Sequence, residues 1–227
     1  MVTAASSDRN ARRRWRDPNG LALPKKAPGR LITSEQFLDW VDEDTRADLI
    51  GGQIFMHSPV SLRHADLLNF LHPLTVGFVQ ELELGVVHRE NVAVRLSVRE
   101  TFLPDLAYFT NEQRVHFHEN HIATQPTLAV EVLSPSTADN DRIRKFAAYE
   151  LHQVQEYWLL DPRKLEHRFF HRSGEQFVEF AQGEERVTSF SLPGFWLERA
   201  WLNPERLPKV GACLSRLLAT AKRNGRR

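Results

Sequence analysis

Two short apolar runs in the middle of the chain have the pattern of neighbouring β-strands. The first, Leu106–Phe109, follows directly on Asp105, and the second extends from Thr127 to Leu133. Both are rich in aliphatic, aromatic or β-branched residues and lie between turn residues, as strands usually do. In the second run both alternating faces are apolar except at Glu131, so we expect a strand that is covered on both sides.

The exception, Glu131, needs a partner. An ionised carboxylate inside such a strand costs several kcal/mol unless it is paired or bound to a metal ion. Asp105 stands at the start of the neighbouring strand, and it can partner Glu131 only through a cation between the two. Two carboxylates that converge at the edge of a buried sheet form a natural site for a hard divalent ion such as Mg²⁺.

The other patterns predict helices and strands that alternate along the chain. A capping box from Thr33 to Gln36 begins a short helix, and Gly51-Gly52 joins a β-hairpin over residues 47–56. A long helix is predicted over residues 62–84, and Pro73 should kink or break it. The later segments are an irregular strand over 86–96, a helix over 137–151, a strand over 156–160, an antiparallel meander over 165–190 and a C-terminal helix over 207–221.

Length and composition limit the class of protein. The chain has 227 residues, of which 41% are hydrophobic, enough for one core-forming domain with tails. No apolar run is long enough to span a membrane, and the N-terminus lacks the apolar segment of a secretory signal. Cys213 is the single cysteine, which excludes an intrachain disulfide and a zinc site built from cysteines. We therefore expect a cytoplasmic protein.

The net charge is +1, but it is distributed unevenly. Residues 1–30 hold eight Lys or Arg against two Asp or Glu, and residues 204–227 hold seven against one. Residues 31–203 hold fifteen against twenty-six, which argues against phosphate binding over the whole surface. We interpret 1–30 as a disordered basic tail, with a DNA-contacting arm as the alternative. Residues 31–203 then form the domain, and 204–227 form a basic segment that could be helical.

A second polar pattern follows the Glu131 strand. Asp141, Lys145 and Tyr149 are spaced i, i+4, i+8, so they share one face of the predicted helix. The first turns of that helix should lie near the two carboxylates. A lysine beside metal-binding carboxylates can orient or deprotonate a water, or neutralise charge on a phosphate. The alternative is an ordinary surface pair between Asp141 and Lys145.

Taken together, these motifs resemble a known family. Their order is Pro104-Asp105, then Glu131-Val132-Leu133-Ser134-Pro135-Ser136, then Asp141, Lys145 and Tyr149, then Glu156-Tyr157-Trp158 and Asp161-Pro162. This order and spacing resemble the Uma-two family of restriction-endonuclease-like proteins, in the PD-(D/E)XK nuclease superfamily, over about residues 31–202. The resemblance implies an α/β fold with a central mixed β-sheet flanked by helices, to which the antiparallel meander is added. It also implies a magnesium-dependent phosphodiesterase site.

The resemblance also implies roles for single residues. Asp105 and Glu131 match the metal-binding acids, and Lys145 matches a lysine that has moved from the strand to the following helix. Asp48 stands where the family usually has a glutamate in the first hairpin, which makes it a third candidate ligand. Gln53 stands where a second glutamate is common, so one acid is shortened and another is neutralised.

Further polar residues have weaker signals. His64 follows Ser58-Pro59, as a histidine does in the family, and could position a water; a helix-surface histidine is the alternative. Asp141 and Tyr149 would support the site from the helix. The motif of His116, His118 and His121 has a spacing that suits neither a helix nor the polar segment in which it lies, so we predict no zinc site there.

Two functions remain open from the sequence. The first is a magnesium-dependent endonuclease that hydrolyses DNA phosphodiester bonds, with Mn²⁺ as a substitute ion, Asp105, Glu131 and Asp48 as ligands and Lys145 assisting. The second is a catalytically eroded nuclease fold that acts as a nucleic-acid-binding or protein-interaction module. DNA is the expected partner, no membrane association is expected, and a homodimer is compatible with the sequence.

Overall fold

A six-stranded mixed sheet forms the centre of the molecule. The computed structural model describes residues 27–42, 44–134, 138 and 140–224. The strand order in this central sheet is β11 (Gln176–Phe180), β10 (His167–Ser173), β9 (Glu156–Leu160), β8 (Leu128–Val132), β6 (Leu106–Thr110) and β3 (Gly85–Arg89). Strands β8 and β9 are parallel, and the other neighbours in this sheet are antiparallel.

A second, smaller sheet is built around the predicted hairpin. Its strand order is β2 (Gln53–Met56), β1 (Ala47–Ile50), β5 (Thr101–Phe102), β4 (Ala93–Arg95) and β7 (His121–Ile122). Gly51 and Gly52 have φ values of 58° and 84°, which the two-residue turn requires and which glycine adopts without strain. Helix α1 (Ser34–Trp40) packs on this sheet through Phe37 and begins with the predicted capping box from Thr33 to Gln36.

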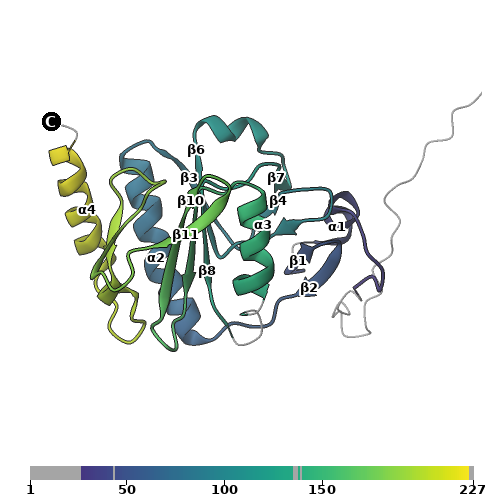
Figure 1. Cartoon of the computed structure of the whole chain (residues 1–227), viewed down its shortest axis with the longest axis horizontal. Coiled ribbons are helices and arrows are strands. Elements are labelled where there is room, and N and C mark those ends of the chain that lie inside the picture. Colours follow the sequence, from purple (N-terminus) through teal and green to yellow (C-terminus); the bar gives the residue numbers. More distant parts are fainter. Residues whose placement is uncertain (1–26, 43, 135–137, 139, 225–227) are drawn as a thin grey trace, which may run out of the picture.

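Helices cover both faces of the central sheet. Helix α2 (Leu62–Glu81) and helix α4 (Val210–Asn224) lie on one face, and helix α3 (Phe146–Leu151) lies on the other (Figure 1). On the first face, Leu128, Val130 and Val132 of β8 share a core with α2, and on the second face Ala129 packs with Tyr149. The prediction that the Glu131 strand is apolar and covered on both sides is therefore confirmed, as is the mixed α/β fold class.

Several predicted elements differ from the structure. Pro73 does not end α2, because its neighbours Leu71 and Leu74 are fully buried and their packing holds the helix together around the missing hydrogen bond. The single strand predicted over 86–96 is two strands, β3 and β4, in different sheets. A tight turn separates them, in which the N–H groups of Asn91 and Val92 both donate to the Arg89 carbonyl.

The predicted meander is also only partly correct. Strands β10 and β11 form a hairpin at the edge of the central sheet, but β12 (Arg186–Thr188) pairs with β13 (Trp196–Glu198) in a separate two-stranded sheet. The side chains of Phe195 and Leu197 are buried in the core that α2 and α4 share. This packing holds β13 on that core, and β12 pairs with β13 instead of with β11. Short 3₁₀ helices occupy Glu112–His116 (η1) and Arg199–Leu202 (η3).

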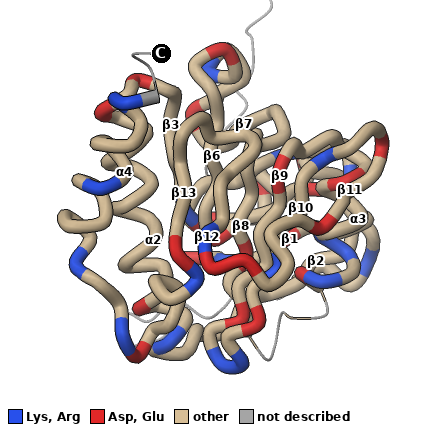
Figure 2. Tube along the Cα trace, turned by 60° about the vertical axis from the view of Figure 1, so that its left-hand side comes forward, with Lys and Arg blue, Asp and Glu red and all other residues tan. Residues whose placement is uncertain are grey.

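The C-terminal segment is helical and packs on the core of the domain. The C-terminal helix begins later than predicted, at Val210, and its buried Cys213 and Leu217 belong to the central core. Of the predicted basic tail, residues 1–26 lie outside the described ranges. Lys and Arg positions are spread over several elements rather than gathered on one face (Figure 2). None of the helices within the described ranges has both the length and the hydropathy needed to cross a bilayer.

Candidate active site

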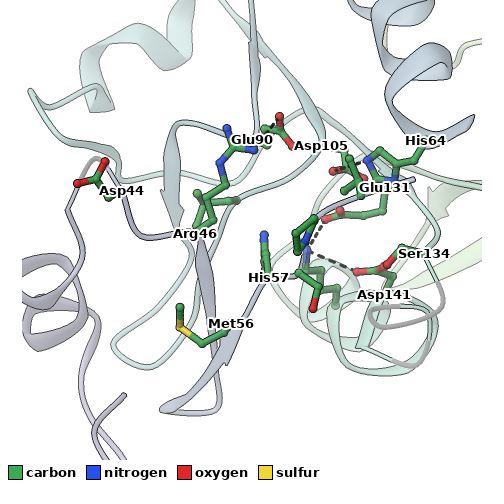
Figure 3. A pocket seen from close by; sticks show the side chains of 15 residues that line it. Asp44, Arg46, Met56, His57, His64, Glu90, Asp105, Glu131, Ser134 and Asp141 are labelled. Atoms are coloured by element: carbon green, nitrogen blue, oxygen red, sulfur yellow. Dashed lines mark hydrogen bonds and ion pairs between the residues drawn. The ribbon is translucent and has the colours of Figure 1, made fainter. Parts of the chain in front are cut away.

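Asp105 and Glu131 meet at one edge of the central sheet. Strands β6 and β8 are antiparallel with Leu106 opposite Val130, so the next position along places Asp105 opposite Glu131. Residues that are directly opposite in an antiparallel pair point to the same face. Asp105 Oδ2 accepts a hydrogen bond from the Val132 N–H at 2.6 Å, which fixes its carboxylate beside the strand. Both side chains line one pocket of about 320 Å³ (Figure 3).

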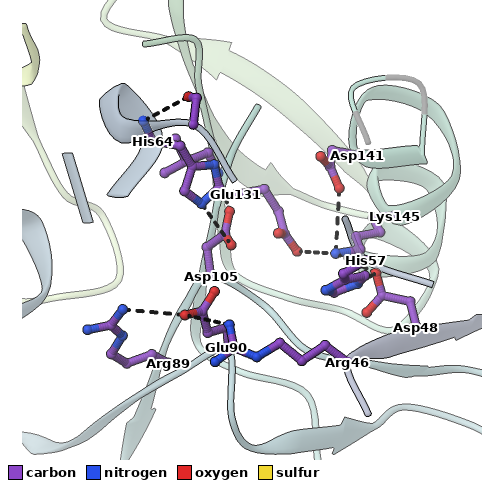
Figure 4. A network of polar contacts seen from close by, with 12 residues as sticks. Arg46, Asp48, His57, His64, Arg89, Glu90, Asp105, Glu131, Asp141 and Lys145 are labelled. Atoms are coloured by element: carbon purple, nitrogen blue, oxygen red, sulfur yellow. Dashed lines mark hydrogen bonds and ion pairs between the residues drawn. The ribbon is translucent and has the colours of Figure 1, made fainter. Parts of the chain in front are cut away.

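Lys145 reaches the same pocket from the helical segment after β8. Residues Asn140–Lys145 form a π-helical turn (η2), which continues directly into α3. The Lys145 ammonium is 2.9 Å from Asp48 Oδ2, 3.0 Å from Glu131 Oε1 and 3.5 Å from Asp141 Oδ1 (Figure 4). Asp141 and Lys145 are each only 2% exposed, so the alternative of a surface pair is wrong.

The charges around Lys145 stabilise its ammonium form. Burial alone favours the neutral amine, but the carboxylates of Asp48, Glu131 and Asp141 outweigh this effect and raise the pKa of Lys145 well above its ordinary value. Since the pKa rises, the side chain is a cation and a hydrogen-bond donor near neutral pH. In this arrangement the ammonium donates hydrogen bonds to the carboxylates around it.

Glu131 has two protein partners and an excess of negative charge nearby. Its Oε1 accepts hydrogen bonds from the Lys145 ammonium and from the Tyr149 hydroxyl, each at 3.0 Å. Burial is the main cause that raises the pKa of Glu131 well above its ordinary value; Lys145 opposes it, and Asp141, Asp105 and Asp48 add to it. The Lys145 ammonium is thus shared among more than one carboxylate of the described residues.

Asp48 is held against Lys145 from the second sheet. Its Oδ1 accepts a hydrogen bond from the Leu103 N–H at 2.8 Å, and its Oδ2 lies 2.9 Å from both Lys145 Nζ and His57 Nε2. Burial opposes the charge, but Lys145 and His57 outweigh it and lower the pKa of Asp48 to about 2. Both oxygens of Asp48 are therefore engaged by donors of the protein itself.

These contacts bear on the three-carboxylate ion site that the resemblance implied. Within the described part of the chain, no three side chains of the types His, Cys, Asp or Glu lie close enough together to hold one ion. Asp48, Asp105 and Glu131 thus do not converge on a single ion position in this arrangement. Gln53, the other substituted position, is exposed and does not line the pocket.

His64 lies beside Asp105 and is buried. It stands in the first turn of α2, which Ser61 caps, and its side chain is 3% exposed. Its Nε2 is 3.4 Å from Asp105 Oδ1, and neither ring nitrogen makes a hydrogen bond within the described residues. Burial lowers the pKa of His64, but the Asp105 carboxylate outweighs it and raises the value above the ordinary one. The helix-surface alternative for His64 is therefore wrong.

The sequence reasoning missed several residues of the pocket. His57 follows β2 and contacts Asp48, and Arg46 and Glu90 form an ion pair of 3.2 Å in the wall of the pocket (Figures 3 and 4). Their position depends on how the small sheet packs on the central one, and no local motif signals that packing. The histidines His118 and His121 stack on each other with ring centroids 4.6 Å apart and take no part in this pocket.

The chain is similar to a known protein family and to two curated proteins. The Uma2 family model, described as "Putative restriction endonuclease", matches residues 34–200. Two curated relatives from Synechocystis sp. bear the names "Uncharacterized protein sll1609" and "Uncharacterized protein slr1290". The first is 28% identical and covers 60% of this chain and 77% of its own length, and the second is 27% identical and covers 76% and 92%.

A solved structure shares the fold. It is the crystal structure of a "putative nuclease belonging to DUF820" from Anabaena variabilis, with a TM-score of 0.60 and 17% sequence identity. The likeness covers 82% of this chain and 99% of that one. The arrangement of a mixed sheet between helices is thus shared over most of this chain.

Proposed function

The chain belongs to the Uma2 family, described as "Putative restriction endonuclease", and from this premise we propose that it is a magnesium-dependent endonuclease that hydrolyses DNA phosphodiester bonds. The observation that carries the proposal is the buried group of Asp105, Glu131 and Lys145 at one edge of the central sheet. Burial of this many charges has no stabilising value of its own, since a well-packed apolar core would be at least as stable. Such groups are concentrated at functional sites.

The donor set fits a magnesium ion. Mg²⁺ in enzymes usually keeps several waters and is bound by one or two carboxylates together with substrate phosphates. Asp105 and Glu131 supply two carboxylates on one face, and Glu131 Oε2 makes no hydrogen bond with the described residues. When bound, the ion would polarise the scissile phosphate and lower the pKa of a water. Mn²⁺ suits the same oxygen ligands.

The protein's own groups would orient and stabilise the reacting atoms. The Lys145 ammonium would donate hydrogen bonds to the attacking water or to the phosphate, where negative charge accumulates. Asp48 and Asp141 hold that ammonium in place, and the Tyr149 hydroxyl holds Glu131 from the other side. His64 would maintain the orientation of the Asp105 carboxylate through its contact of 3.4 Å.

The eroded-site alternative rested on Asp48 and Gln53. Gln53 is exposed outside the pocket, so its missing charge does not alter the site. Asp48 still has its carboxylate, and this carboxylate holds Lys145. Neither substitution removes Asp105, Glu131 or Lys145, and the enzyme is therefore the better supported function.

The proposal is tested by incubating the purified protein with supercoiled plasmid and with long genomic DNA, in Mg²⁺, in Mn²⁺ and in EDTA. We expect nicked or linear products with either ion and none in EDTA. Asp105→Asn should lose the activity, whereas Asp66→Asn, a matched change of an exposed carboxylate on α2, should keep it. A folded wild-type protein that cleaves nothing with either ion, or an Asp105→Asn variant that cleaves normally, would refute the endonuclease.

A further inference from the structure

A second pocket opens next to the candidate active site and has the opposite charge. It has a volume of about 420 Å³, and we call it the basic groove. Its lining consists of Arg63, Leu133, Ser134, Ala138, Arg142, Asp161, Arg163 and Lys164. Ser134 lines both this groove and the active-site pocket, so the two adjoin.

The topology of the central sheet explains why they adjoin. Strands β8 and β9 are parallel with Val132 opposite Leu160, and the Leu133 N–H donates to the Leu160 carbonyl at 2.8 Å. The segments that follow the two strands therefore leave the sheet at the same edge, about 5 Å apart. One of these segments carries Ser134 and the other carries Asp161.

The remaining basic residues are chain neighbours of residues in the active site. Arg63 precedes His64 at the start of α2, and Arg142 follows Asp141 in the π-helical turn. His64 and Asp141 point into the active-site pocket, and their chain neighbours Arg63 and Arg142 line the adjoining groove.

Positive charge dominates the basic groove. Arg63, Arg142, Arg163 and Lys164 are all exposed, and among the described residues of the lining Asp161 is the single acid. Arg63 also pairs with Glu205, which lies outside the lining. The Asp161 carboxylate pairs with Arg142 at 3.3 Å and accepts the backbone N–H groups of Arg163 and Lys164, each at 3.0 Å. Asp161 thereby fixes the turn, while the side chains of Arg163 and Lys164 have no ion pair among the described residues.

In the lining of the active-site pocket, acidic side chains outnumber Lys and Arg. The acids are Asp44, Glu90, Asp105, Glu131 and Asp141, and the basic residues are Arg46 and Lys145. A polyanion is repelled by such a pocket unless a cation is bound there, so its attraction to the protein must come from elsewhere. Exposed cations that line a groove beside the pocket suit contacts to a chain of phosphates.

We propose that the basic groove binds the backbone phosphates of duplex DNA next to the bond that is cut. This inference rests on the proposed function, because it takes the scissile phosphate to lie in the adjoining pocket. Arg163 and Lys164 are the main contacts, since their charges are not neutralised within the described structure. Contacts of this kind fix the position of the duplex and contribute no sequence recognition.

The test compares two double variants of equal charge change. Arg163→Ala with Lys164→Ala removes two exposed side chains of the groove and keeps the backbone N–H groups that Asp161 accepts. Lys222→Ala with Arg223→Ala removes two exposed cations from the last turn of α4. The affinity for a fluorescently labelled DNA duplex is measured by anisotropy over a range of salt concentrations, in EDTA so that no cleavage occurs.

We expect the groove variant to bind DNA about tenfold or more weakly at low salt. The slope of log affinity against log salt should fall by about 1 to 2, since each phosphate contact contributes roughly 0.9. The α4 variant should keep both the affinity and the slope of the wild type. Hydrolysis of the small diester bis(p-nitrophenyl) phosphate with Mg²⁺ should be unchanged in both variants, because it needs the active-site pocket alone.

Three results would contradict DNA binding by the basic groove. The wild type could fail to bind DNA, the groove variant could keep the affinity and slope of the wild type, or the α4 variant could lose as much DNA affinity as the groove variant. Tighter binding of an RNA duplex of the same length would reject DNA as the ligand. A wild-type protein that hydrolyses neither DNA nor the small diester, while only the groove variant loses DNA binding, would support the groove and refute the endonuclease.

Discussion

The Lys145 ammonium lies 3.0 Å from Glu131 Oε1, and both side chains are buried. Glu131 therefore has a cationic partner before any metal ion binds, whereas the sequence analysis considered Asp105 as its partner, with a cation between the two. Because Asp48 and Asp141 contact the same ammonium, one cation serves three carboxylates. Among the described residues, the ion-pair partner of Asp105 is His64.

The first prediction separates the role of Lys145 from ion binding. Lys145→Met keeps the length of the side chain but removes the charge. The apo variant should lose about 3–5 kcal/mol of unfolding free energy, the usual result of leaving buried charges unpaired. Mg²⁺ should raise its melting temperature at least as much as in the wild type, since a positive charge near the ion has gone. DNA cleavage should fall by about 10²–10³-fold.

The control for Lys145 is Lys145→Arg, which retains the charge. It should recover most of the stability but little of the cleavage, because a planar guanidinium does not reproduce the position of a compact ammonium. Wild-type cleavage by Lys145→Met would show that the lysine serves only to balance charge inside the fold.

The second prediction separates Asp48 from Asp105. Asp48→Asn should destabilise the protein, because Lys145 and His57 lose a charged partner, but it should still be stabilised by Mg²⁺. Asp105→Asn should lose that stabilisation, which for a single ion site amounts to about 2.7 kcal/mol when the ion is at a hundred times its Kd. Differential scanning fluorimetry with and without Mg²⁺ measures both effects.

Asp66→Asn is the matched control for both variants and should respond to Mg²⁺ as the wild type does. If Asp48→Asn abolishes the magnesium effect as completely as Asp105→Asn, then Asp48 is an ion ligand, as the family resemblance implied, and the bound state differs from the arrangement described above.

The third prediction concerns the pH dependence of stability. Burial, with a contribution from Arg199, lowers the pKa of His167 to about 4, from an ordinary value of about 6.5. Between about pH 6.5 and pH 4, His167 is therefore protonated in the unfolded chain but neutral in the folded protein. Because the unfolded state binds the extra proton, the unfolding free energy falls as the pH drops through this range. The maximum loss from this one group is on the order of 3 kcal/mol.

Urea unfolding of the wild type and of His167→Gln at a series of pH values checks this. The unfolding free energy of the wild type minus that of His167→Gln should decrease steadily as the pH is lowered from about 6.5 to about 4. His118→Gln changes an exposed histidine and should follow the wild type throughout. A constant difference between the wild type and His167→Gln would mean that His167 titrates equally in both states.

The fourth prediction is that removal of residues 1–30 leaves the fold intact. Their composition, rich in Arg, Pro and Gly, cannot bury a core. The melting temperature and the far-ultraviolet circular dichroism of the truncated protein should match those of the full chain within a few degrees. A large fall in melting temperature would show that this segment packs on the domain.

Local patterns were sufficient for part of the site. The apolar run around Glu131 predicted a doubly covered strand, and the i, i+4 spacing placed Asp141 and Lys145 on one helical face; both follow from the geometry of single elements. The contact between His57 and Asp48, the division of residues 86–96 between two sheets and the pairing of β12 with β13 were not predictable. Each depends on segments that are distant in sequence and come together only through packing.

The parallel pairing of β8 with β9 has a consequence for how the protein folds. Parallel strands cannot be joined by a tight turn, so a crossover must form between them, and here that crossover contains the π-helical turn and α3. Lys145 and Tyr149 lie on this connection. The step that adds β9 to the sheet is therefore also the step that delivers the ammonium and the hydroxyl to Glu131. The β8–crossover–β9 unit thus carries both the buried carboxylate and the groups that donate hydrogen bonds to it.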